Sequence, residues 1–186
     1  DLSNTTIDPI QLSKILNKLK KQNINNVIME ASSHGLSQNR LDGLLFNTGI
    51  FTNLSQDHLD YHKNTKNYLK AKLYLFEKLI KKRGNIITDE QIPEFKKIKD
   101  ISIKKNLNLF SLLDKKDNFQ FLSHQYEGET QLLEIKHKNS IHKIKLNLIG
   151  KIQFKNILMA VIASIKSSIN IKDILNILPK IKSVEG

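Results

Sequence analysis

The chain has 186 residues, 39% of them hydrophobic, which is enough material for one globular domain with a true core. The absence of cysteine excludes disulfides and thiolate metal sites, and the absence of an unbroken run of about 18 apolar residues excludes a membrane-spanning helix. The net charge of +12 raises a nucleic-acid hypothesis, but the lysines are spread along the chain and only two arginines occur, so we expect solvated basic faces and no nucleic-acid partner.

The first quarter of the chain predicts a helix and then two short strands. Asp8 and Pro9 are a typical helix start, with Asp8 as the N-cap, and the leucines and isoleucines of residues 12–19 follow helical spacing. The apolar residues 27–29 predict a buried parallel strand, and residues 50–52 predict a second short strand.

The middle of the chain predicts a long helix over residues 65–80, which we expect to end at Gly84. A buried strand over residues 85–88 and a helix over about 93–99 follow. In the second half, residues 107–110 predict a strand, and the alternation of residues 133–135 and 144–148 predicts an antiparallel hairpin. Closing helices are expected at about 153–168 and 171–179. This order indicates a single α/β domain over residues 1–186, with a parallel sheet and a small antiparallel addition.

Polar side chains follow the first two predicted strands. Glu30 comes directly after residues 27–29, where the carboxyl end of a strand would offer it to a metal or a phosphate. A helix-capping role explains a glutamate at this position equally well. His58 and His62 follow the second strand at a spacing of four, but no third soft ligand accompanies them, so the neighbouring carboxylates favour Mg²⁺ over zinc. Two exposed histidines on an isolated helix are the alternative.

Lys72 shares a predicted helix face with Tyr68, Leu75 and Phe76, a face that should be buried. A buried ammonium is costly unless it is paired, and burial favours the neutral amine, which could act as a base or add CO₂ to form an anionic carbamate. The spacing alone favours the simpler case, in which the stem is buried and the charged end reaches water.

Long stretches of the chain resemble the Mur ligases. The run VIMEASSHGLSQNRLDGLLF and the later run FTNLSQDHLDYHKNTKNYLKAKLYLF are similar to the central domain of that family over about residues 27–76. The segment Asn4-Thr5-Thr6 resembles a short motif that precedes these runs, and residues 150–160 resemble the G-x-F-N-x-x-N-x-x-A stretch. The S-S-H-G-x-x-Q-x-R portion is similar to the branch that extends UDP-MurNAc-L-Ala-D-Glu.

The resemblance implies an α/β fold with a mostly parallel, P-loop-type sheet, in a bacterial cytoplasmic enzyme that uses ATP to add diaminopimelate or lysine to UDP-MurNAc-L-Ala-D-Glu. It also implies roles for single residues. Glu30, His58 and carbamylated Lys72 would hold Mg²⁺, and Asn156 would contact the nucleotide base. The UDP-MurNAc-dipeptide would be held by Thr5, Thr6, Ser32, Gln38 and Arg40.

The chain departs from the family pattern at several points. Ile152 and Gln153 stand where phenylalanine and asparagine are usual, and Lys63 replaces a glycine. The only Gly-Lys pair, Gly150-Lys151, is not part of a P-loop motif, so we expect the P-loop before residue 1 and the domain that selects the amino acid after residue 186. The alternatives are another Mur-like ligase, such as a folylpolyglutamate synthase or a cyanophycin-synthetase-like domain, and a non-catalytic basic binding module.

Overall fold

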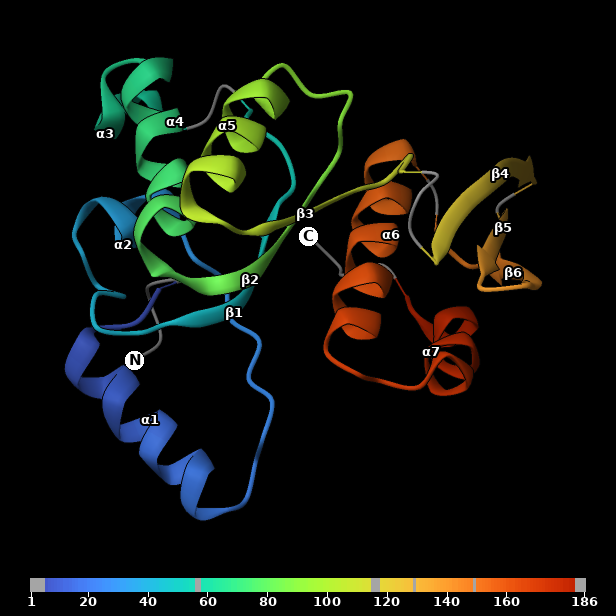
Figure 1. Cartoon of the computed structure of the whole chain (residues 1–186), viewed down its shortest axis with the longest axis horizontal. Coiled ribbons are helices and arrows are strands. Elements are labelled where there is room, and N and C mark those ends of the chain that lie inside the picture. Colours follow the sequence, from blue (N-terminus) through green and yellow to red (C-terminus); the bar gives the residue numbers. More distant parts are fainter. Residues whose placement is uncertain (1–5, 56–57, 115–117, 129, 149, 183–186) are drawn as a thin grey trace. The chain divides into compact units, whose positions relative to one another are not determined.

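A computed structural model describes residues 6–55, 58–114, 118–128, 130–148 and 150–182, and these form two compact units. The first unit comprises residues up to 47 together with 54–81, and the second comprises residues 48–53 and those from 82 onward. Figure 1 labels the elements of both units. Among the helices in the described part of the chain, none combines the length and the apolar character that crossing a membrane requires.

The first unit is helical. Its elements are α1 (Pro9–Lys21), α2 (Ser33–Ser37), α3 (Leu59–His62), α4 (Thr65–Tyr74) and a π-helical turn over Leu75–Leu79. The predicted start of α1 is confirmed, because the Asp8 carboxylate accepts hydrogen bonds from the backbone N–H groups of Ile10 and Gln11. The core of this unit is built from leucines of α1, of α2 and the turn after it, and of the π-helical turn: Leu12, Leu36, Leu41 and Leu79.

The second unit contains two three-stranded sheets, except that residues 46–47 and 80–81 of the first sheet belong to the first unit. One sheet has the order β1 (Phe46–Phe51), β2 (Ile80–Thr88), β3 (Asn108–Ser111), and β2 and β3 pair in parallel. The other is an antiparallel meander of β4 (Phe119–Glu127), β5 (Thr130–His137) and β6 (Ser140–Leu146). The predicted mixture of parallel strands, helices and a small antiparallel addition is therefore confirmed.

Four further helices complete this unit: α5 (Phe95–Lys105), α6 (Lys151–Lys166), α7 (Ile171–Ile177) and a short 3₁₀ turn (Leu178–Lys180). The main core lies where one face of the antiparallel sheet meets α6 and α7. Alternate residues of β5 point into it, including Leu133 and Ile135, and α6 contributes Phe154, Leu158 and Val161.

Three expectations about the elements were wrong. Residues 27–29 form no strand: Ile28 is 99% exposed, and the segment pairs with no strand in the described ranges. An apolar run with high strand propensity becomes a strand only where a neighbour completes its hydrogen bonds. The long helix ends at Leu79, since the chain becomes extended at Ile80, and Gly84 therefore lies inside β2. The helix expected at 93–99 runs to Lys105, where Asn106 takes a left-handed conformation that ends it.

Candidate functional site

A hydrogen-bonded cluster in the first unit centres on Thr6, a residue that is only 1% exposed. Its hydroxyl donates to the Glu30 carbonyl over 3.3 Å and accepts from the Ser32 backbone N–H over 2.9 Å. The Ser32 hydroxyl lies 2.9 Å from the same oxygen and accepts from the Gly35 backbone N–H over 3.1 Å. Thr6 thus fixes the extended backbone on both sides of Ala31 and the start of α2.

These contacts decide what each hydroxyl can still bind. A hydroxyl has one donor and two acceptor positions, and Thr6 uses all three if Ser32 donates to it. Ser32 then donates to Thr6 and accepts from Gly35, which leaves Ser32 one acceptor position for another partner. Thr6 is therefore an anchor for its neighbours, and Ser32 is the hydroxyl of the pair that retains binding capacity.

Gly35 packs so closely on Thr6 that no other residue fits. A Cβ atom at position 35 would lie 2.6 Å from the Thr6 Cβ and Cγ2 atoms. The lack of a side chain at this position is what allows α2 to begin directly beside the buried threonine.

Arg40 completes this cluster. Its Nη1 donates to the Thr6 carbonyl oxygen over 2.8 Å, and the side chain is half-buried. A guanidinium has five N–H groups, and this bond uses one of them, so Arg40 is held in place and keeps donors for an anionic ligand. The sequence-predicted residues Thr6, Ser32 and Arg40 are thus brought together, whereas Thr5 lies outside the described residues.

Aromatic side chains form a second cluster in the same unit. The ring of His34 lies 4.9 Å from that of His58, 4.1 Å from that of Tyr61 and 5.5 Å from that of His62. Gln38 lies beside this cluster, because its Nε2 donates to the Tyr61 hydroxyl over 3.1 Å.

The two histidines four residues apart have different environments. His58 precedes α3 in a left-handed conformation and is exposed. His62 is buried and hydrogen-bonded to the Ser33 hydroxyl at 2.9 Å, so the alternative of two exposed histidines is wrong. Burial lowers the pKa of His62, and the neighbouring His34 and His58 lower it further. His62 is therefore neutral at pH 7 and acts as part of the packing.

Lys72 lies half-buried on α4, on the same side as the buried ring of Tyr68. Its Nζ is 5.2 Å from the centre of that ring, and the ring of His58 meets the same tyrosine at 6.0 Å. His58 and Lys72 therefore both lie near one aromatic side chain. The ammonium form gains a cation–π contact here, worth about 0.5–1 kcal/mol at an exposed site.

A metal ion would have enough ligands here only if Lys72 carried a carbamate. Within the described ranges, no three histidine or acidic side chains lie close enough together to hold a metal ion. Glu30 is exposed, and its backbone is held by the hydrogen bond that its carbonyl accepts from the Thr6 hydroxyl. One carboxylate, one imidazole and a carbamate would suit a hard cation that keeps water and phosphate oxygens as its other ligands, as Mg²⁺ does.

Asn156 lies in the second unit, half-buried on α6. Beside it the structure reveals polar residues that the sequence analysis did not single out, above all Asp89 and Lys155, which form an ion pair. Asp89 directly follows β2, so it carries the same signal that identified Glu30, a polar residue after a strand. His34 and His62 were missed as packing partners, because ring contacts between α2 and α3 leave no periodic signal.

Comparison with known proteins gives three kinds of similarity. The model of a family described as the Mur ligase middle domain matches residues 1–164. The chain is 36% identical over 182 residues to UDP-N-acetylmuramoyl-L-alanyl-D-glutamate–2,6-diaminopimelate ligase of Rickettsia bellii, covering 98% of this chain and 38% of that protein. It is also 36% identical over 186 residues to the protein of the same name from Fusobacterium nucleatum, covering 98% and 37%.

A solved structure of a UDP-N-acetylmuramoyl-L-alanyl-D-glutamate–2,6-diaminopimelate ligase superimposes with a TM-score of 0.83 at 24% identity, over 100% of this chain and 39% of that one. At this identity the similarity concerns the fold. The chain spans less than two fifths of the length of the curated relatives described above.

Proposed function

Because the chain belongs to the Mur ligase middle-domain family, we propose that it is the ATP-handling middle domain of a peptidoglycan-synthesis ligase. The whole enzyme would add the third amino acid to UDP-MurNAc-L-Ala-D-Glu in the bacterial cytoplasm. The names of the relatives support this substrate and point to 2,6-diaminopimelate as the added amino acid. The observation that carries the proposal is the convergence of Thr6, Ser32 and Arg40 beside the backbone of Glu30.

The UDP-MurNAc-dipeptide would be bound by the residues that the cluster around Thr6 holds in place. Arg40 would bind an anionic group of this substrate, because its guanidinium is already fixed by the Thr6 carbonyl and has donors to spare. Ser32 offers one acceptor position, and Gln38 offers its carbonyl oxygen while its amide nitrogen is bonded to Tyr61. Thr6 would act indirectly by orienting Ser32 and Arg40. Thr5, which precedes Thr6 in the chain, would also hold this substrate.

Mg²⁺ would be held by Glu30, His58 and a carbamylated Lys72. When bound, it would spread the negative charge of the transferring phosphoryl group. Lys72 would need its neutral amine for carbamylation, and carbamylation would give up the cation–π contact of the ammonium with Tyr68. His58 would coordinate through a neutral ring.

ATP would be bound partly by Asn156, with a P-loop contributed by a preceding part of the enzyme. In the proposed reaction, the γ-phosphoryl group of ATP is transferred to the side-chain carboxylate of D-Glu, which gives an acyl phosphate and ADP. The amine of the amino acid then attacks the acyl carbon, phosphate leaves and the amine loses a proton. The residues of this chain would contribute by positioning the two substrates and by neutralising their charges.

The test is phosphate release by the full-length enzyme. Release should require ATP, UDP-MurNAc-L-Ala-D-Glu and diaminopimelate together, and omission of any one should abolish it. The same 186 residues alone should release none. Release that depends on a reduced folate and glutamate would overturn the proposed substrate and favour the folylpolyglutamate synthase alternative. Salt-sensitive, saturable DNA binding without any ligase activity would favour a binding module.

A further inference from the structure

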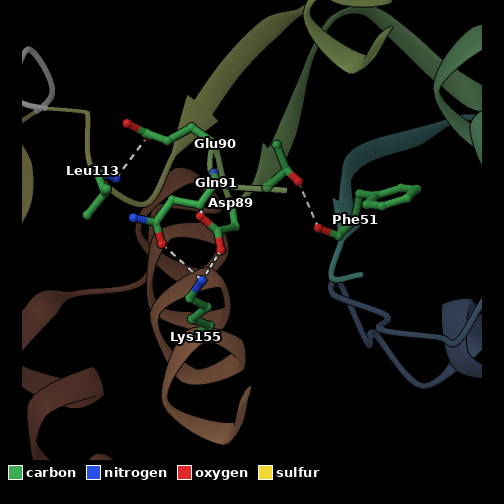
Figure 2. A network of polar contacts seen from close by, with 7 residues as sticks. Phe51, Asp89, Glu90, Gln91, Leu113 and Lys155 are labelled. Carbon is green, nitrogen blue, oxygen red and sulfur yellow. Dashed lines mark hydrogen bonds and ion pairs between the residues drawn. The ribbon is translucent and has the colours of Figure 1, made fainter. Parts of the chain in front are cut away.

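The Asp89 carboxylate connects the carboxyl end of β2 with α6 (Figure 2). Its side chain is 2% exposed. One of its oxygens, Oδ1, accepts from the Gln91 backbone N–H over 3.0 Å, and Oδ2 accepts from Lys155 Nζ. The same Nζ donates to the Gln91 side-chain oxygen over 3.2 Å. A single carboxylate therefore connects the loop after the strand with the first half of the helix.

This ion pair is expected to be strong because little water reaches it. The Lys155 side chain is 24% exposed, and its charge compensates a carboxylate that is almost fully buried. Loss of either partner would leave the other charge partly desolvated and unpaired. The helix is thus fixed where Lys155 lies, and that residue directly precedes Asn156.

Phe154, the residue before Lys155, is held by a contact with the antiparallel sheet. Phe154 is buried, and His124 of β4 stacks on its ring at a centroid distance of 4.3 Å. His124 is bonded at 2.5 Å to the Oε1 of the buried Gln131, whose Nε2 donates to the Leu148 carbonyl. Since Gln131 uses its nitrogen on Leu148, its oxygen must accept from His124, and the Nε2 of the histidine carries a proton.

The start of α6 lacks the usual means of fixation. Its N-cap is Gly150, with φ 108°, and among the residues that the structure describes no side chain caps the helix. A helix without a cap can fray in its first turn, which ends at Phe154 and is followed directly by Lys155. Consecutive helical side chains point about 100° apart, so two contacts at neighbouring positions fix both the height and the rotation of the helix. They also fix the direction of the next side chain, that of Asn156.

We propose that Asp89 and Lys155 are positioning residues for nucleotide binding, which act by orienting Asn156. This inference rests on the proposed function, because it takes Asn156 as a ligand of the ATP base. The ion pair itself would contact no substrate. Its role is to keep α6 in one rotation, so that Asn156 is ready for the nucleotide before ATP arrives.

The test uses Lys155→Met and Asp89→Asn in the full-length enzyme, with ATP affinity measured by isothermal titration calorimetry. Methionine keeps the reach of lysine without its charge, and asparagine keeps an acceptor for the Gln91 N–H. We expect each change to weaken ATP binding about tenfold, because misplacing a binding group by about 1 Å can have an effect of this order or larger. The KM for ATP should rise with kcat nearly unchanged, and the KM for UDP-MurNAc-dipeptide should stay constant.

Three comparisons make the test specific. Lys155→Arg keeps the charge and should bind ATP like the wild type. Lys143→Met, which removes the ion pair with Glu134 (2.8 Å), is the matched control and should have no effect. In an Asn156→Ala background, Lys155→Met should cause no further loss, because the residue through which it acts is already absent.

Unchanged ATP affinity in Lys155→Met and Asp89→Asn would overturn the inference. So would an equal loss of affinity for both substrates, additive effects in the Asn156→Ala background, or unfolding of both variants by circular dichroism, since each indicates a purely structural pair. A wild-type enzyme that does not bind ATP would instead refute the proposed function, and a wild-type affinity in Asn156→Ala alone would refute the nucleotide role of that residue.

Discussion

Thr6→Val should destabilise the first unit through polar groups that lose their partners. Valine has nearly the shape of threonine, so it leaves no cavity, but it lacks the hydroxyl that serves the Glu30 carbonyl and the Ser32 N–H. A buried polar group without a partner costs about 1–3 kcal/mol. Two such groups, each partly reached by water, give an expected loss of about 2–4 kcal/mol.

The assay is urea unfolding followed by circular dichroism, with Thr6→Ser as the control. Serine keeps the hydroxyl and removes one methyl group, for which burial accounts for about 1 kcal/mol. A loss of 2–4 kcal/mol in a chain of this size corresponds to a fall in Tm of about 4–16 °C. If Thr6→Val proved no less stable than Thr6→Ser, the hydrogen bonds of Thr6 would not be what holds this cluster together.

Three further predictions concern neighbouring side chains. Because the pKa of His62 is lowered in the folded state, the unfolded chain binds more protons, so stability should fall as the pH drops below the ordinary histidine value of 6.5. In His62→Asn, urea unfolding between pH 7.5 and 5.5 should show a smaller fall; an identical fall would exclude this histidine as its source. Arg40→Lys in the full-length enzyme should raise the KM for UDP-MurNAc-dipeptide by the equivalent of about 1–3 kcal/mol, whereas an unchanged KM would make Arg40 merely structural. Lys72→Ala should abolish most phosphate release without unfolding the protein, and formate or acetate, but not bicarbonate, should partly restore it. Near-normal turnover of that variant in CO₂-depleted buffer would rule out the carbamate.

Local signals in the sequence predicted the elements whose boundaries depend on nearby residues. The start of α1 follows from Asp8 and Pro9, and the hairpin of β5 and β6 follows from alternation on either side of a short turn. Elements that depend on distant partners were harder to predict. Residues 27–29 have the composition of a buried strand, yet Ile28 is exposed, because composition does not tell whether a neighbouring strand is present.

For the candidate site too, the sequence predicted the residues that lie in motifs but not the contacts between distant residues. The motifs identified Ser32, Gln38 and Arg40, and the structure gathers them around Thr6 and Tyr61. Neither spacing nor composition could show that the Thr6 hydroxyl is bonded to Glu30 and Ser32, since these partners lie far along the chain. The pairing of Asp89 with Lys155 could not be predicted from the sequence either, because 66 positions separate the two residues.

Because Gly35 lies so close to Thr6, the residue at position 35 indicates whether these two segments are in contact. The conflict that a methyl group would create there is with the Thr6 Cβ as well as its Cγ2, so exchanging threonine for serine or alanine would not relieve it. Any residue at position 6 except glycine would meet the same obstacle. Alanine at position 35 would therefore push the Thr6 segment away from α2, although the Thr6 hydroxyl would still be present. Among natural sequences, a residue larger than glycine at this position would mark a protein in which the two segments no longer cross.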